Sequence, residues 1–92
     1  MDKPRQSSPF ISSVRDAIRL RHYSKRTESS YVDWVKRFIR FNDYKHPADM
    51  AEAEVARFLS HLSLNRNVAP STQNQALNAL VFLYKVVLDK PL

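Results

Sequence analysis

The sequence of 92 residues contains no glycine and no cysteine. Glycine makes up about 7% of an average protein and supplies the positive φ angles of tight hairpins and of phosphate-binding loops, so its absence argues against both and favours helices. Without cysteine the chain has no disulfide, no zinc knuckle of the usual kind and no thiol nucleophile, which fits a reducing compartment. We therefore expect an all-α protein in the cytoplasm.

Long apolar runs are also missing. The longest, Ala79 to Tyr84, is too short to cross a bilayer, and the first ten residues lack the apolar core of a signal peptide. We therefore expect no membrane partner. A chain of this length has room for one core that buries roughly two thirds of the unfolded surface. With a hydrophobic content of 43%, the sequence predicts a single folded domain.

Positive charge is concentrated in one half of the chain. The 15 Lys and Arg residues exceed the 9 Asp and Glu residues, which gives a net charge of +6. Residues 1–46 contain 11 basic and 5 acidic residues, whereas residues 47–92 contain 4 of each. A basic face of this kind attracts polyanions, and nucleic acid is the first partner to consider. An acidic protein, a lipid headgroup or a merely solubilising surface would explain the same excess.

Apolar residues recur at steps of three and four in four segments, which predicts four helices. The first begins at Phe10, after a flexible arm of residues 1–9 that ends in a proline. The second follows Ser24, its predicted N-cap, and runs to about residue 42. The third covers roughly residues 52–65, and the fourth opens after Pro70, with Ser71 as its expected cap.

Two of these helices are expected to supply most of the core. The second carries one aromatic face, predicted to be buried, formed by Tyr31, Trp34, Val35, Phe38 and Phe41. The fourth is expected to be central and mostly buried through a wide apolar arc of Ala76, Leu77, Leu80, Val81, Leu83, Tyr84, Val87 and Leu88. On the outer face of the second helix, Asp33 stands four residues before Arg37, a spacing that predicts an ordinary surface ion pair.

Residues suited to catalysis or metal binding are not grouped in the sequence. His22, His46 and His61 are scattered, without metal-ligand spacing or a paired acid, and no HExxH motif occurs. Tyr84 falls on an apolar stripe and is interpreted as a core residue. The sequence therefore predicts no catalytic residue, no metal site and no cofactor.

The starts of the second and fourth helices are polar. Ser and Thr are ordinary N-caps, but free N–H groups and the helix dipole at such an end also attract phosphate, and Asn or Gln side chains read base edges in a major groove. Capping explains the serines, but not the amides of the fourth helix, because an apolar helix gains little stability from them. The candidate DNA-contacting residues are Ser24, Lys25, Arg26, Thr27, Ser29, Ser30, Ser71, Thr72, Asn74, Gln75 and Asn78.

Several separated blocks of the sequence, spread over roughly residues 10–92, match a known pattern in order. The blocks are Arg21-His22-Tyr23-Ser24-Lys25-Arg26-Thr27, Tyr31-Val32-Asp33-Trp34-Val35, His46-Pro47, Glu54-Val55, Phe58-Leu59, Ser71-Thr72-Gln73, Gln75-Ala76-Leu77-Asn78-Ala79-Leu80 and Phe82-Leu83-Tyr84. Together they resemble the N-terminal core-binding domain of integron integrases, which are tyrosine recombinases.

The resemblance implies a compact four- to five-helix SAM-like bundle over residues 10–89, with residues 90–92 opening a linker to a catalytic domain. Such a bundle clamps one side of the recombination site during cassette integration and excision. In related recombinases the N-terminal halves of the second and fourth helices approach the major groove, which implies that the candidate residues named above contact DNA. The family's catalytic residues lie beyond position 92, so no tyrosine of this chain inherits the role of the nucleophile and the chain alone is not expected to cut DNA.

The resemblance also implies partners. They are a duplex attachment site, a folded single-stranded hairpin site, the catalytic domain and other protomers of a bacterial recombinase. The family's element for capturing extrahelical bases lies mainly in the catalytic half, so shape readout through phosphates would suit this chain. A second interpretation is a helical protein-interaction module whose basic face meets an acidic partner. A metal- or nucleotide-dependent enzyme is a third, and any turnover by the chain would support it.

Overall fold

The computed structural model describes residues 8–92, which form four α-helices and no strand. The helices are α1 (Pro9–Leu20), α2 (Lys25–Phe41), α3 (Glu52–Leu64) and α4 (Pro70–Phe82), with a short 3₁₀ turn η2 (Pro47–Asp49) and a π-helical continuation of α4, η3 (Leu83–Val87). This confirms the predicted all-α class. No helix within residues 8–92 combines the length and the hydropathy that a membrane span requires.

Serine side chains cap the first two helices. The Ser8 hydroxyl accepts a hydrogen bond from the N–H of Ile11 at 3.2 Å, and Pro9 occupies the first helical position, where its missing N–H costs nothing. The Ser24 hydroxyl accepts from the N–H of Thr27 at 3.1 Å, which confirms its predicted role as N-cap. The end of the predicted arm therefore belongs to α1, and the rest of the arm, residues 1–7, lies outside the described residues.

The other two helices begin without a hydroxyl cap. At α3 the Glu54 carboxylate reaches back and accepts from the N–H of Ala51 at 2.8 Å, a hydrogen bond that lowers the pKa of Glu54. At α4 the cap position is Ala69, which has no side-chain acceptor. The expectation that Ser71 caps this helix is wrong, because Pro70, with its fixed φ and no N–H, takes the first helical position and moves the cap one residue earlier.

The ends of α1 and α2 show how the chain manages without glycine. His22 and Asp43 have φ angles of 61° and 60°, in the left-handed region that glycine usually fills after a helix. Each closes the last turn by donating its N–H to a carbonyl three residues back, that of Arg19 at 2.9 Å and that of Arg40 at 3.1 Å. Short polar or aromatic residues therefore form the helix-ending motifs in this protein.

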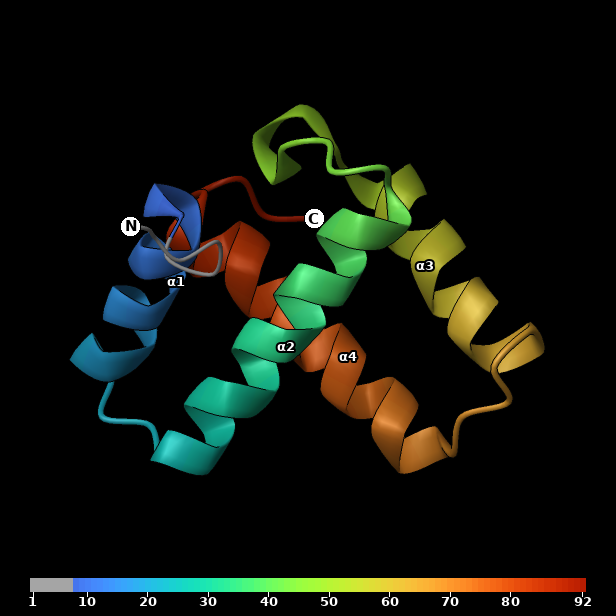
Figure 1. Ribbon diagram of the computed structural model, residues 1–92, viewed down its shortest axis with the longest axis horizontal. Coiled ribbons are helices and arrows are strands. Elements are labelled where there is room, and N and C mark those ends of the chain that lie inside the picture. Colours follow the sequence, from blue (N-terminus) through green and yellow to red (C-terminus); the bar gives the residue numbers. More distant parts are fainter. Residues whose placement is uncertain (1–7) are drawn as a thin grey trace, which may run out of the picture.

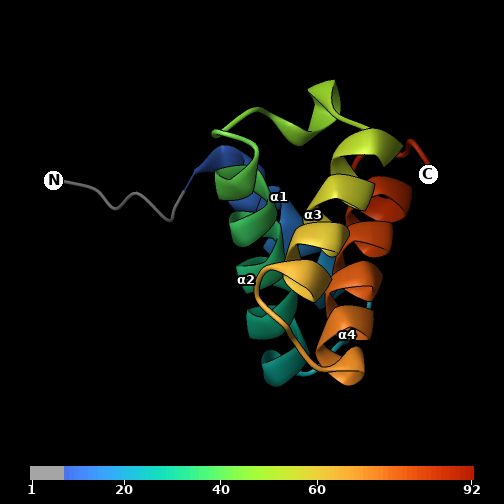
Figure 2. The ribbon, with the colours of Figure 1, turned by 90° about the vertical axis from the view of Figure 1, so that its right-hand side faces the viewer.

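Helices α2 and α4 cross at the centre of the bundle and make the most extensive contact of any two elements, with α1 and α3 on either side of them (Figure 1). Both crossing helices begin at the same end of the molecule, and a view turned by 90° shows the same arrangement (Figure 2). The core between the helices is formed by Ile11, Val14, Ile18, Val32, Trp34, Val35, Phe38, Met50, Val55, Phe58, Leu62, Ala76, Ala79, Leu80, Phe82, Leu83 and Tyr84.

Some residues assigned to the core by spacing lie at its edge. Phe41, at the last turn of α2, is 39% exposed, whereas Val32 is buried in its helix. On α4, Leu77 and Val81 are 38% and 41% exposed. The prediction of burial is wrong for Phe41, Leu77 and Val81. The apolar arc of α4 is wider than the surface that its neighbours cover, and Phe41 packs on Phe58 and His61 of α3 while the rest of its ring stays in solvent. Ala79, in contrast, is fully buried where α4 is closely packed.

The predicted ion pair between Asp33 and Arg37 does not form. The Arg37 guanidinium carbon instead lies 4.3 Å from the centre of the Trp34 ring. A cation over the face of an indole is attracted by the ring quadrupole, and contact with a well-buried ring gains more than an exposed ion pair of about 0.3–0.5 kcal/mol. The Arg37 side chain is therefore turned along the helix toward the gap between α2 and α3.

Tyr84 is buried, which confirms its assignment to the core, and it connects the end of the bundle where α2 ends and α3 begins. Its hydroxyl donates to the carbonyl oxygen of Pro47 at 2.8 Å, which joins η3 to the α2–α3 connection. Nearby, the Lys90 ammonium donates to the carbonyl of Ala48 at 2.7 Å. Burial raises the pKa of Tyr84 to about 12.

Candidate nucleic-acid interface

The two groups of candidate residues lie at the same end of the bundle, where α2 and α4 begin (Figures 1 and 2). The first group is Ser24, Lys25, Arg26, Thr27, Ser29 and Ser30, and the second is Ser71, Thr72, Asn74, Gln75 and Asn78. The two helix starts diverge from the crossing point, so the groups stand apart on one end of the molecule instead of forming a single cluster (Figure 1). We call this end, defined by these residues, the polar end.

On α2 the candidate residues are accessible, but one of them also serves the fold. Lys25, Arg26 and Ser29 are exposed, and Ser30 is half-buried. The Ser24 hydroxyl, besides accepting from the backbone, donates to the Thr27 hydroxyl at 3.1 Å. Ser24 is therefore engaged as a helix cap, whereas no ion pair within residues 8–92 involves the two basic side chains.

On α4 the amides are exposed and unengaged. None of Asn74, Gln75 and Asn78 makes a side-chain hydrogen bond within residues 8–92. Asn78 lies one helical turn beyond the other two, so the three amides share one face. The backbone N–H groups of Ser71 and Thr72 have no hydrogen-bond acceptor within residues 8–92, because the cap residue, Ala69, has no side-chain oxygen. The start of α4 thus presents amides and free N–H donors together.

Gln73 lies within this group in sequence but faces the other way. Its Nε2 donates to the carbonyl oxygen of Leu59 at 2.8 Å, and its Oε1 is buried with no hydrogen-bond partner among residues 8–92. Gln73 is not one of the candidate residues, and the sequence alone does not distinguish it from the neighbouring amides Asn74 and Gln75. Only the packing of α3 against α4 separates the structural amide from the exposed ones.

One carboxylate stands near the polar end, and arginine side chains bind it. The Arg19 guanidinium donates to both carboxylate oxygens of Glu28 at 3.0 Å each, across the turn between α1 and α2. The Nε of Arg15 lies 3.9 Å from Oε2 of the same carboxylate. The hydrogen bonds from Arg19 hold the pKa of Glu28 below its ordinary value, with the charges of Arg15 and Lys25 acting in the same direction. The first turn of α4 has no acidic residue, so the polar end keeps its positive charge.

Aromatic packing fixes the turn before α2 against α4. Tyr23 packs on Tyr31 and on Phe82, with ring centres 6.1 and 5.8 Å apart, and Tyr31 in turn packs on Phe82 at 5.7 Å. Burial raises the pKa of Tyr31. The guanidinium of Arg21 lies 5.9 Å from the Phe82 ring. These contacts hold a basic turn beside the start of α2, and only their tertiary geometry reveals them.

No group of three or more His, Asp or Glu side chains within residues 8–92 is arranged to hold a metal ion. His22, His46 and His61 come from three different segments of the chain. His46 caps η2 by accepting from the N–H of Ala48 at 3.0 Å, and His61 packs against the ring of Phe41. The side chains of His46 and His61 thus each have a local structural contact.

The helical topology and the polar end define the described residues as a compact all-α domain with two polar helix N-termini on one end. Residues 10–92 match the family described as phage integrase, N-terminal SAM-like domain. Two curated relatives, an "Integrase/recombinase" from Escherichia coli and another from Pseudomonas aeruginosa, are each 48% identical over 85 residues, which are 92% of this chain and 25% of theirs. The chain belongs to the phage integrase N-terminal SAM-like domain family, and it spans about a quarter of the length of the curated relatives it matches.

The family match confirms the SAM-like bundle that the resemblance implied, and it places the chain among integrases and recombinases. The relatives' names do not distinguish integron integrases from others.

Proposed function

We propose that this chain is the DNA-binding, core-binding domain of a site-specific tyrosine recombinase of the integron integrase type. In this role it clamps one side of the recombination site during cassette integration and excision. The observation that carries the proposal is that both polar helix starts lie at one end of the bundle (Figures 1 and 2). A single duplex at that end would meet both groups of residues at once.

In this proposal the two helix starts have different tasks. Lys25 and Arg26 on α2 neutralise backbone phosphates, and the free N–H groups of Ser71 and Thr72 on α4 bind a phosphate at the positive end of the helix dipole. Ser24, Thr27, Ser29 and Ser30 add hydroxyl contacts to the same backbone. These contacts position the domain on DNA without reading its sequence.

The α4 amides supply the base contacts. Asn74, Gln75 and Asn78 are exposed on one face and make no hydrogen bond within the described residues, so their donor and acceptor groups are available to base edges in a major groove. Few contacts of this kind give modest sequence preference. Most of the recognition then rests on the shape of the site, which suits both a duplex attachment site and a folded single-stranded hairpin.

Cutting and joining of DNA belong, in this proposal, to a catalytic domain elsewhere in the parent recombinase. The chain itself supplies no catalytic residue and needs no metal or cofactor. Residues 90–92 open the linker to that domain, after a folded unit that begins at the Ser8 cap of α1 and ends at about residue 89. The relatives are bacterial, and the proposed place of action is the bacterial cytoplasm, where their DNA lies.

Partners within the recombinase are proposed for an apolar stripe that adjoins the amides of α4. Leu77 and Val81 lie one turn apart on this helix and are 38% and 41% exposed, and apolar side chains left in water favour a partner that covers them. This apolar stripe favours a protein contact with the catalytic domain or with another protomer. It also supports the alternative function, a protein-interaction module whose basic face meets an acidic partner.

A competition experiment separates the two functions. A fluorescent duplex bound to the 92-residue chain is displaced either with unlabelled duplex or with polyglutamate at equal charge concentration, in the same buffer. If the chain is a DNA-binding domain, unlabelled duplex displaces the fluorescent duplex at a much lower charge concentration than polyglutamate does. The reason is that phosphate spacing and groove geometry contribute to binding beyond net charge. Equal competition by polyglutamate would contradict the proposal and favour an acidic protein partner.

A further inference from the structure

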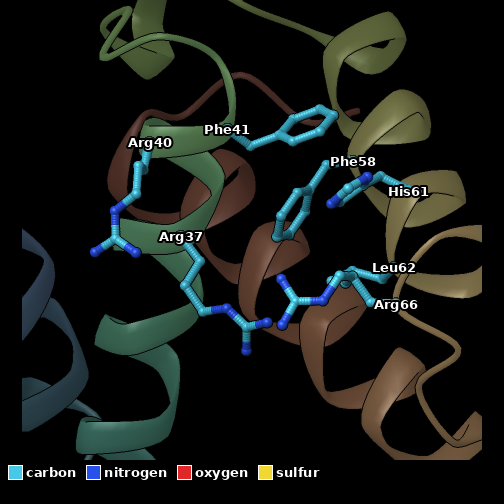
Figure 3. Close-up of a pocket in the computed structure, with 7 residues that line it drawn as sticks. All are labelled: Arg37, Arg40, Phe41, Phe58, His61, Leu62 and Arg66. Atoms are coloured by element: carbon cyan, nitrogen blue, oxygen red, sulfur yellow. The ribbon is translucent and has the colours of Figure 1, made fainter.

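A pocket of about 170 Å³ lies between α2 and α3, apart from the candidate residues of the polar end (Figure 3). At ~30 Å³ per water molecule it has room for about five waters or one small hydrated anion. Its floor is apolar and its rim is basic. The lining residues are Arg37, Arg40, Phe41, Phe58, His61, Leu62 and Arg66.

The pocket gathers positive charge without any acidic residue in its lining. None of its three arginines forms an ion pair with a carboxylate of residues 8–92. In Figure 3 the guanidinium groups of Arg37 and Arg66 point toward one another across the gap, whereas that of Arg40 points away. Two like charges that converge with no carboxylate between them repel each other, and an anion placed between them would reverse that repulsion.

The two arginines are held from different elements. Arg37 extends from the C-terminal half of α2, and its guanidinium carbon lies 4.3 Å from the centre of the buried Trp34 ring. Arg66 follows the end of α3, in the connection to α4. His61 completes the rim, with its ring centre 4.8 Å from that of Phe41. Stacking on an aromatic ring lowers the conformational entropy that Arg37 and His61 would lose on binding a ligand.

The chemistry of the pocket favours a phosphate group. Each guanidinium presents its N–H donors as a planar fork that matches two phosphate oxygens, and two forks can share the oxygens of one tetrahedral group. Arg66 also lies just before the uncapped start of α4, whose N–H groups the proposed function assigns to DNA. Through Arg66 the pocket thus adjoins the start of α4, which belongs to the polar end.

We propose that Arg37 and Arg66 together bind one phosphate of a nucleic-acid backbone in this pocket. The inference rests on the proposed function, to which it adds a contact in the C-terminal half of α2 and in the α3–α4 connection. No local sequence pattern indicates this site, because its two arginines come from separate elements that only the packing of α2 against α3 brings together.

The test measures how the affinity of the chain for a short duplex depends on salt. The slope of log K against log salt counts neutralised phosphates, at about 0.9 for each. Arg66→Ala and the double variant Arg37→Ala/Arg66→Ala should both bind more weakly, and the double variant should lose about one unit of slope in total, because both side chains hold the same phosphate. Arg57→Ala, which removes an exposed arginine of α3 outside the pocket, is the matched control and should keep the slope.

The outcomes separate this inference from the proposed function. If the unsubstituted chain binds DNA and the double variant keeps its full slope, the pocket does not hold a phosphate and only this inference fails. A loss of about two units would mean two separate phosphates and would overturn the shared site. No binding by the unsubstituted chain at low salt would overturn the proposed function itself.

A second measurement identifies the source of the phosphate and guards against misfolding. Trp34 is the only tryptophan, and Arg37 lies on its ring, so its fluorescence reports occupation of the pocket. Duplex DNA should change the emission of the unsubstituted chain, and of Arg57→Ala, but not of Arg66→Ala, while circular dichroism shows all three folded. An equal change with millimolar inorganic phosphate that also blocks the response to DNA would assign the pocket to free phosphate and overturn the backbone contact.

Discussion

The side-chain amide of Gln73 donates to the backbone carbonyl of Leu59 at 2.8 Å and so ties the first turns of α4 to α3. The residues that follow it, Asn74 and Gln75, are exposed and make no such contact. Adjacent amides at the start of one helix therefore divide between holding the fold and facing outward. This division allows the binding role of the outward pair to be tested against an internal control.

Replacing Asn74 and Gln75 together with alanine should weaken DNA binding by about tenfold or more, since a good base contact is worth about 1–3 kcal/mol. The melting temperature should stay the same or rise slightly, because alanine has the higher helix propensity. Gln73→Ala is the control: loss of its hydrogen bond, about 1 kcal/mol, should lower the melting temperature by about 4–8 °C. Equal losses of stability in both variants would show that the outward amides are structural.

Arg26 is expected to contact a phosphate from the start of α2. Arg26→Ala should therefore reduce the salt slope of DNA binding by about one unit for every sequence tested. Lys85→Ala removes the same charge from η3 at the opposite end of the bundle and should leave the slope unchanged (Figure 1). Fluorescence anisotropy at four or more salt concentrations measures both. A slope in Arg26→Ala equal to that of the unsubstituted chain would remove this residue from the interface.

Glu28 is the one acidic residue in the first turn of α2, and Arg19 holds its carboxylate. Glu28→Gln should release that arginine and tighten binding to all DNA sequences several-fold, with a steeper salt slope. Asp89→Asn, which makes the same charge change near the C-terminal end, should leave affinity almost unaltered. If both variants bind alike, the start of α2 does not face DNA.

The same carboxylate should affect stability with a defined pH dependence. Because Arg19 lowers the pKa of Glu28 in the folded chain, the stabilisation is present above the ordinary pKa of 4.5 and is lost as the pH falls through the lower folded value. Glu28→Gln should therefore melt below the unsubstituted chain at pH 7, and the difference should shrink toward pH 3. Thermal denaturation at both pH values measures it. A difference that persists unchanged at pH 3 would contradict the ion pair as its cause.

Tyr84 should stabilise the far end of the bundle through its hydroxyl. Tyr84→Phe leaves the Pro47 carbonyl without its donor and should lower the free energy of unfolding by about 1–3 kcal/mol in urea denaturation. Because burial raises the pKa of the phenol to about 12, folding favours its protonated form. That stabilisation is complete below about pH 10, the pKa in an unfolded chain, and is lost as the pH rises through about 12. Tyr84→Phe should lose less stability than the unsubstituted chain over this range, and an identical loss would contradict the assignment.

The sequence predicts the four helices because their apolar spacing and caps are local, and the third, 52–65, is matched by Glu52–Leu64. A local pattern does not show which part of a wide apolar arc is covered by a neighbouring helix. The spacing therefore predicts burial for Leu77 and Val81, which are partly exposed in the fold. For the same reason the spacing favours Asp33 as the partner of Arg37, whereas in the folded chain Arg37 lies over the Trp34 ring.

The candidate interface follows the same division. Polar composition marks the starts of α2 and α4, and alternating helix direction brings both to one end. Spacing cannot separate Gln73 from Asn74, because which amide faces α3 is set by the rotation of α4 in the bundle. The pocket of Arg37 and Arg66 brings together residues from distant segments, and no pattern within either segment predicts it.

The most direct test of the central claim is fluorescence anisotropy of the 92-residue chain with three labelled DNAs at two salt concentrations. The DNAs are a folded integron-type hairpin, a duplex attachment site and a scrambled duplex. The account predicts salt-sensitive binding to all three, with tighter binding to the hairpin or the attachment site than to the scrambled duplex. If the chain binds none of the three DNAs at low salt, its proposed role as a DNA-binding domain is contradicted.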